Sequence, residues 1–242
     1  MVISSNNGMI ALICVGGFVL VICVILLLSA FQSGKRKKGF AAAVAGLGFV
    51  PQQKADVELL AQLQAVYAPA KVNKVTNIAT RLVGDEHYYI FDCTYITPST
   101  YSNQSSSSSA TEFNNLAVLS PHLDLPPFIL LCRMKAPGAL AGLADRVLTM
   151  GAASAGFKEY LEVPTVFQMN YMLFVNDDPR VKDAFTDTLL TQIGMMDSVV
   201  GRGAGQLLIV NRFNLRASSK LDPAQLSEQV TLAKQLTDWL VK

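Results

Sequence analysis

The longest uninterrupted apolar run of the chain lies near its amino terminus. Residues 9–31 contain no Asp, Glu, Lys, Arg or His. A helix of this length would extend over about 34 Å, enough to cross the hydrocarbon core of a bilayer. The pattern predicts a transmembrane helix here. A basic cluster follows it directly, formed by Lys35, Arg36, Lys37 and Lys38.

The distribution of basic residues predicts the orientation of this helix. Residues 1–8 contain no Lys or Arg, and the flank with more Lys and Arg normally stays inside the cell. We therefore expect a short extracytoplasmic amino terminus over residues 1–8 and everything from residue 32 onward in the cytoplasm. A cleaved secretory signal would need a basic segment before a shorter apolar core, and this chain has neither. The expected location is the bacterial inner (plasma) membrane, crossed once, with the basic cluster against the lipid headgroups.

Beyond a basic flank and membrane-proximal segment over residues 32–53, we expect one soluble domain over residues 54–242. Residues 39–48 are rich in alanine, which favours a short helix close to the membrane. Apolar residues at helical spacing predict an amphipathic helix over residues 54–67, and Pro69 ends it. Residues 75–83 and 87–97 are rich in β-branched and aromatic side chains, with a turn signal between them, which predicts a hairpin.

After this hairpin the sequence predicts a loop and then two further strands. Residues 98–110 include five consecutive serines, which predict a flexible loop. Strands are expected over residues 112–120 and 128–133, the second introduced by a proline pair.

Four elements and a hairpin are predicted in the second half. The spacing of Leu140, Leu143, Val147 and Met150 indicates a helix, and residues 172–175 indicate a strand. A single helix is expected after Pro179, with Val181, Phe185, Leu189 and Ile193 as its buried stripe. The last helix is expected to start at Asp222 and to end near Val241.

A glycine-rich segment is the one sequence that looks like a phosphate cradle. Residues 201–205 read Gly-Arg-Gly-Ala-Gly, but no Lys-Ser or Lys-Thr pair follows them, and a strand-like run does. We interpret the segment as the turn of a hairpin between strands over residues 198–200 and 206–213.

Because most strands follow one another through hairpins, the predicted class is α+β. The expected domain is a largely antiparallel β-sheet with several packing helices, preceded by one N-terminal transmembrane helix.

Charge and cysteine content narrow the function classes. The chain has 20 basic and 18 acidic residues, and the basic cluster accounts for its net charge of +2, so the domain itself is slightly acidic. This balance argues against a nucleic-acid partner. The four cysteines show no spacing typical of a metal site, and we expect them to be reduced thiols.

Three segments resemble one known group of proteins. They are Phe91-Asp92-Cys93-Thr94-Tyr95, Leu125-Pro126-Pro127-Phe128 and the run from Phe167 through Tyr171 to Thr186. With the anchor and basic cluster, the chain resembles an uncharacterised family of bacterial single-pass membrane-anchored proteins with a cytoplasmic-type α+β domain. The resemblance implies a fold and a topology, and it implies no activity.

The residue types of an active site are sparse. There are two histidines, His87 at a predicted turn and His122 in a predicted loop, and neither has a nucleophile in a recognisable motif. Acidic residues cluster where a helix begins, which capping explains. We therefore predict no catalytic residue, no metal ligand and no cofactor.

Two functions from different classes remain. The first is a non-enzymatic domain, tethered to membrane lipid through its anchor, that recruits or scaffolds another protein. The Ser-rich loop and the membrane-proximal helix are the expected docking places. The alternative is a small-ligand-binding sensor or an enzyme with a dispersed site, formed by polar or aromatic residues of the strands: Asp92, Tyr95, Arg133, Tyr171 and Arg212.

Overall fold

The computed structural model describes residues 39–98, 107–133, 139–212 and 222–241. Its contacts divide the chain after Ala42, and the fold below is that of the unit Ala43–Lys242. The predicted transmembrane helix and the basic cluster lie outside the described residues. Within the described ranges, no helix is both long and apolar enough to cross a bilayer.

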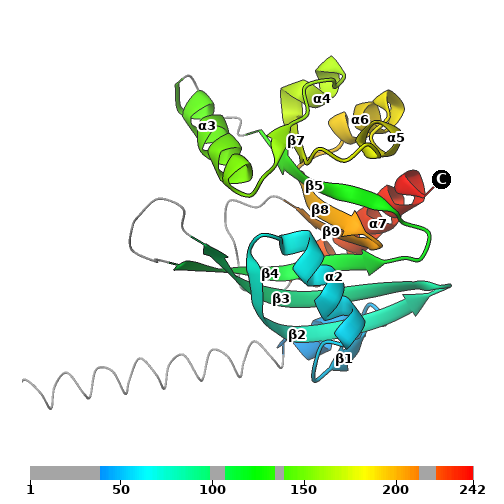
Figure 1. Cartoon of the computed structure of the whole chain (residues 1–242). Helices are drawn as coiled ribbons and strands as arrows, with labels where there is room; N and C mark the ends of the chain where they lie inside the picture. The colour runs from blue at the N-terminus through cyan, green and yellow to red at the C-terminus, as the bar shows by residue number, and fades with distance from the viewer. Residues whose placement is uncertain (1–38, 99–106, 134–138, 213–221, 242) are drawn as a thin grey trace, which may run out of the picture. The chain divides into compact units, whose positions relative to one another are not determined.

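A nine-stranded sheet forms the centre of the unit, in the order β1-β2-β3-β4-β9-β8-β5-β7-β6 (Figure 1). All of its strand pairs are antiparallel. With the helices beside it, the sheet confirms the α+β class. The strands are β1 (Val50–Gln52), β2 (Lys71–Val83), β3 (Glu86–Pro98), β4 (Ser107–Leu119), β5 (Leu125–Cys132), β6 (Lys158–Glu159), β7 (Tyr171–Val175), β8 (Val199–Gly205) and β9 (Leu207–Arg212).

The predicted first and last helices of the domain are present. Each begins at an aspartate whose side chain accepts a hydrogen bond from the first turn, Asp56 from the Leu59 amide and Asp222 from the Ala224 amide. Residues 39–45 are also helical. The labelled helices are α2 (Val57–Tyr67), α3 (Ala139–Ser154), α4 (Thr165–Asn170), α5 (Val181–Ala184), α6 (Asp187–Gly194) and α7 (Pro223–Leu240).

Helices cover both faces of the sheet. Figure 1 shows α2 crossing in front of β2 and β3, where Leu59 and Leu63 are buried against Phe91 and Ile209. Because successive side chains of a strand point to opposite faces, the neighbours Leu208 and Val210 lie on the other face, where they meet α6 and α7. The sheet therefore carries two apolar layers.

The first predicted hairpin is confirmed. β2 and β3 pair from Lys71 to Val83, and Gly84 makes the turn with a φ of +65°. Glycine adopts this left-handed conformation without a steric cost, which is why the turn signal of the sequence was reliable here.

The Ser-rich segment differs in part from the expectation. Residues 99–106 lie outside the described residues, but β4 already begins at Ser107, which pairs with Pro98. The serines that follow are exposed. A strand end needs only backbone hydrogen bonds, so it can extend beyond the core without apolar side chains.

The single helix expected after Pro179 is wrong. The structure has α5 and α6 there, and the chain leaves helical geometry at Phe185. Thr186 caps α6 by accepting a hydrogen bond from the Leu189 amide, 3.3 Å away, and a capping residue needs a non-helical backbone. The predicted stripe is nevertheless buried, because Val181, Phe185, Leu189 and Ile193 are each at most 5% exposed.

The interpretation of residues 201–205 as a hairpin turn is also wrong. These residues belong to β8, which pairs with β5 on one side and β9 on the other. The turn comes at its end, where Gly205 has a φ of +56°. The hydrogen bonds of a sheet use backbone groups alone. Pairing with the strands on both sides therefore keeps these glycines in a strand, although glycine has a low strand propensity.

The sequence pattern also missed three elements, β1, α4 and β6. They contain three, six and two residues. Periodicity needs a longer window than these elements provide, so nothing in the pattern marked them.

Candidate functional site

Four side chains form a polar cluster beneath the end of α2. The Nη2 of Arg202 donates to Oε1 of Glu112 at 2.7 Å. The hydroxyl of Tyr67 donates to Oε2 of Glu112 at 2.6 Å, and that of Tyr95 donates to Oε1 at 3.1 Å. The Arg202 guanidinium also lies 4.5 Å from the centre of the Tyr67 ring. We refer to these four residues as the polar cluster.

Strand alternation brings the polar cluster to one face. On β3, Tyr95 lies two positions beyond Cys93 and so points to the same face. Glu112 on β4 pairs directly with Cys93. Arg202 lies between Gly201 and Gly203 of β8, and Tyr67 is the last residue of α2. Four separate elements therefore contribute one side chain each.

The electrostatics of the polar cluster follow from its partial burial. The side chains of Arg202 and Glu112 are 22% and 26% exposed. Burial is the main cause that raises the pKa of Tyr67 well above its usual value, and it also raises the pKa of Tyr95. Burial is the largest single influence on the Arg202 guanidinium and lowers its pKa. The Glu112 carboxylate, together with Tyr67, Tyr95 and Cys93, more than offsets burial and raises that pKa, so the guanidinium stays charged.

The Cys93 thiol lies on the same face and is fully buried. Burial is the largest cause, and the charge of Glu112 the second, of a pKa raised to about 11. Because the thiolate is the reactive form, this cysteine is chemically inert near neutral pH.

The polar cluster is therefore suited to holding elements together. Both carboxylate oxygens of Glu112 already accept hydrogen bonds, and its charge is paired with Arg202. Through these contacts the cluster joins α2, β3, β4 and β8 by their side chains. The sequence had marked Tyr95 and Arg202 separately; their association with Glu112 and Tyr67 had no local signal.

Asp92, another residue of the predicted dispersed site, is not part of the polar cluster. Its Oδ2 accepts from the side-chain amide of Asn77 at 2.6 Å, and its Oδ1 accepts from the backbone amide of Asn114 at 2.9 Å. Both asparagines have a positive φ, 50° and 55°, at irregular points of β2 and β4. One carboxylate on β3 thus fixes a bulge in each neighbouring strand.

The other three predicted residues are also separate. Arg133 follows β5 directly and donates to Glu159 at 2.8 Å, to Asp145 and to the backbone carbonyl of residue 168. These three contacts connect the end of β5 with β6, α3 and α4. The hydroxyl of Tyr171 donates to the Met196 carbonyl at 2.9 Å. Arg212 pairs with Glu228 of α7 at 3.0 Å. The structure therefore does not bring the five residues of the dispersed site together.

The two histidines make different contacts. His122 lies 2.6 Å from Asp85, and both side chains are more than half exposed. The ring of His87 stacks on Tyr89, with the ring centres 6.1 Å apart. Across the described ranges no three His, Cys, Asp or Glu side chains are grouped as a metal ion would require.

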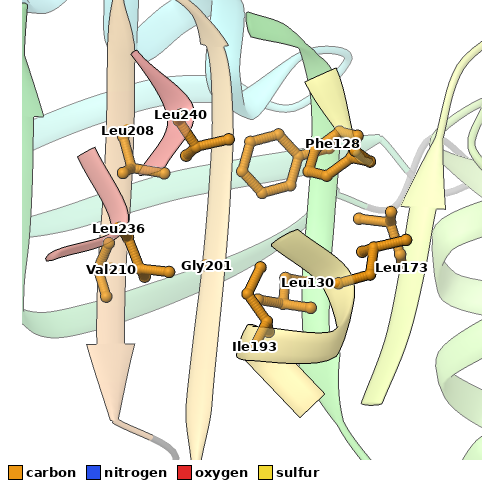
Figure 2. A pocket seen from close by; sticks show the side chains of 11 residues that line it. Phe128, Leu130, Leu173, Ile193, Gly201, Leu208, Val210, Leu236 and Leu240 are labelled. Atoms are coloured by element: carbon orange, nitrogen blue, oxygen red, sulfur yellow. The ribbon is translucent and has the colours of Figure 1, made fainter. Parts of the chain in front are cut away.

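Figure 2 shows a purely apolar cavity. It lies on the opposite face of the sheet from the polar cluster, because Gly201 and Arg202 are neighbours on β8 and point to opposite faces. The cavity is small, with room for about one or two water molecules, and no nitrogen or oxygen atom contributes to its surface. We refer to it as the Gly201 cavity. Its lining residues are Phe128, Leu130, Leu173, Phe185, Leu190, Ile193, Gly201, Leu208, Val210, Leu236 and Leu240.

An exposed apolar stripe follows α3. Leu143, Val147 and Met150 are 59%, 61% and 60% exposed, and their spacing of four and three residues places them on one face of the helix. These are three of the four positions whose spacing predicted the helix, and the structure has a helix there. The three side chains are exposed, however, so this part of the apolar stripe does not face the core. We refer to these three residues as the α3 stripe.

Comparisons with known proteins give little beyond these observations. No protein-family model and no curated protein matches the chain. Among solved structures, the chain is similar to the crystal structure of the mycobacterial trehalose monomycolate transport factor A, TtfA, with 11% sequence identity and a TM-score of 0.48. The match covers 85% of this chain and 94% of that chain.

Proposed function

We propose that this chain is a membrane-tethered, non-enzymatic domain that recruits a protein partner at the inner face of a bacterial membrane. The proposal includes the anchor over residues 9–31, the cytoplasmic location of the domain and membership of the family of single-pass anchored proteins that the sequence resembles. The observation that carries it is the α3 stripe.

The α3 stripe has the geometry of a docking helix. An amphipathic helix that inserts into a groove presents anchors at spacings of three and four residues, as Leu143, Val147 and Met150 do. Contiguous exposed apolar side chains on a soluble surface mark an interaction site more often than a structural need. The partner we propose is a protein with an apolar groove that accepts α3.

The polar residues of the domain support the same function. Glu112, Asp92 and Arg133 are each engaged by side chains or backbone of the domain itself. Such engaged groups hold the elements of the domain together.

Site-specific photocrosslinking in cells tests the proposal. A photoreactive residue replaces Leu143 or Met150 in the full-length chain, and replaces Glu58 on α2 as the matched exposed control. We expect one protein adduct from both α3 positions and none from position 58. The adduct must disappear with Val147→Asp and persist with Val57→Asp, the same change at an exposed valine of α2.

Two results would contradict the proposal. Adducts that contain only lipid or a second copy of the chain would exclude a recruited partner. A protein adduct that survives Val147→Asp would show that the α3 stripe is not the docking surface.

A further inference from the structure

Four exposed apolar side chains gather where the chain enters the packed unit. They are Val50 of β1, Val57 and Leu60 of α2, and Leu82 of β2, which are 65%, 84%, 39% and 60% exposed. We refer to these four residues as the entry patch.

Strand pairing places two of them on one face of the sheet. Val50 pairs with Thr80, which pairs in turn with Tyr89 of β3, and side chains at paired positions point to the same face. Leu82 lies two positions beyond Thr80 and shares that face. Tyr89 belongs to the core beneath α2, so Val50 and Leu82 lie on the face that α2 covers.

The start of α2 completes the entry patch. The hydroxyl of Tyr89 donates to Oδ2 of Asp56 at 2.9 Å, and Asp56 is the cap of α2. Val57 is the next residue, and Leu60 follows three positions later on the same side of the helix. Apart from Glu58, α2 contains no charged residue. Few charges would therefore lose their hydration if this corner of the unit approached an apolar phase.

The length of the connecting chain holds the entry patch close to the bilayer. The packed unit begins at Ala43, and Val44 is fully buried. Residues 32–43 connect it to the end of the predicted span, and those from residue 39 on are helical. Their reach is at most about 32 Å, from about 3.5 Å for each extended residue and about 1.5 Å for each helical one. Because β1 begins at Val50, the entry patch is the exposed apolar surface next to this connection.

We propose that the entry patch inserts into the headgroup region of the bilayer that holds the anchor. The proposal rests on the anchor over residues 9–31, which is part of the proposed function. Apolar side chains at a membrane interface contribute binding free energy in proportion to the apolar area that they remove from water. The bilayer is an apolar phase within reach of the connection, and it is present whenever the anchor is inserted.

This orientation deepens the proposed recruitment, because it determines where the partner approaches. β1 and β6 are the two edges of the nine-stranded sheet, about 38 Å apart along the sheet at the usual strand spacing. α3 packs beside β6, and Figure 1 shows it far from β1. Insertion of the entry patch therefore turns the α3 stripe away from the bilayer, toward proteins of the cytoplasm.

Photocrosslinking of the full-length chain in nanodiscs of phosphatidylethanolamine and phosphatidylglycerol tests the proposal. A photoreactive residue replaces Val57 or Leu82 of the entry patch, or Leu161 beyond β6, a control that is 71% exposed. A further variant carries it at Leu20, within the predicted anchor. Mass spectrometry identifies the adducts. We expect lipid adducts from positions 20, 57 and 82 and none above background from position 161.

A charge in the entry patch should weaken its insertion. Val57→Asp is expected to reduce the yield of lipid adduct from position 82 about fivefold, because the carboxylate loses hydration at the interface. Leu161→Asp, the same kind of change beside the opposite edge of the sheet, must leave that yield unchanged. Both positions are exposed, so we expect both variants to fold with the Tm of the wild type.

The outcomes distinguish the entry patch from the anchor. Lipid adducts from position 20 but not from positions 57 and 82 would overturn insertion of the entry patch and leave the anchor standing. Protein adducts instead of lipid at positions 57 and 82, or an equal yield of lipid adduct at position 161, would also overturn it. The absence of a lipid adduct from position 20 would contradict the anchor, and the present proposal would fail with it.

Discussion

The guanidinium of Arg202 meets the carboxylate of Glu112 at 2.7 Å, although the two residues are 90 positions apart in the chain. Their strands are not neighbours, because β9 lies between β4 and β8. The pair therefore connects strands across an intervening one, on the face that also receives the end of α2.

Removing one member of this pair should destabilise the protein. Arg202→Met leaves the Glu112 carboxylate without its counter-charge, and we expect a loss of about 2–3 kcal/mol in the free energy of unfolding, less than for a fully buried pair. Arg202→Met combined with Glu112→Leu should cost less than the sum of the two single changes. Urea unfolding followed by the fluorescence of Trp239, the only tryptophan, measures both. Additive losses would show that the two charges are not coupled.

Stability should fall at alkaline pH. Burial raises the pKa of the Cys93 thiol to about 11 and that of the Tyr171 hydroxyl to about 12, and it raises the pKa of Tyr67 as well. The unfolded chain releases these protons from about pH 8.5 for cysteine and about pH 10 for tyrosine, so rising pH favours unfolding. We expect the Tm to be constant near neutral pH and to decrease between about pH 9 and 11. Cys93→Ala should make the first part of this decrease shallower, and an unchanged profile would refute the assignment to the thiol.

Two glycines should respond in opposite ways to alanine. A Cβ at Gly194 of α6 would lie 2.7 Å from the Phe167 backbone nitrogen of α4, so Gly194→Ala must separate the two helices. We expect a loss of about 1–3 kcal/mol in the free energy of unfolding. Gly142→Ala on α3 meets no atom within 4 Å and should stabilise the helix by about 0.5–1 kcal/mol. Chemical denaturation compares the variants, and a neutral Gly194→Ala would contradict the close approach of α4 and α6.

The α3 stripe should contribute little to folding. Leu143 is 59% exposed, whereas Leu190 of α6 is fully buried. We expect Leu143→Ala to change the free energy of unfolding by at most about 0.5 kcal/mol, and Leu190→Ala to reduce it by about 2–5 kcal/mol. A large loss for Leu143→Ala would mean that the stripe packs within the protein and is unavailable to a partner.

A reporter fused after residue 242 tests the proposed topology. Because the basic cluster follows the apolar run, we expect a carboxy-terminal green fluorescent protein to fluoresce in bacterial cells and a carboxy-terminal alkaline phosphatase to be inactive. Replacing Lys35, Arg36, Lys37 and Lys38 by neutral residues should weaken this preference. Phosphatase activity from the wild-type fusion would place the domain outside the cytoplasm.

The sequence by itself determined the elements whose signals are local. The β2–β3 hairpin needed only two β-rich runs and Gly84, and α7 needed only an aspartate cap followed by Pro223. Both signals act within a few residues, where backbone preferences and nearest-neighbour contacts decide the conformation.

Only the tertiary structure decided how β8 is used and which face of α3 is covered. The glycines at 201 and 203 read as a turn because they have low strand propensity, but pairing with β5 and β9 makes them a strand. That pairing points Arg202 toward Glu112 on one face and opens the Gly201 cavity on the other. The period of the side chains shows which residues of a strand share a face. What that face contacts depends on the order of the strands in the sheet, and this order is set by contacts between residues far apart in the chain.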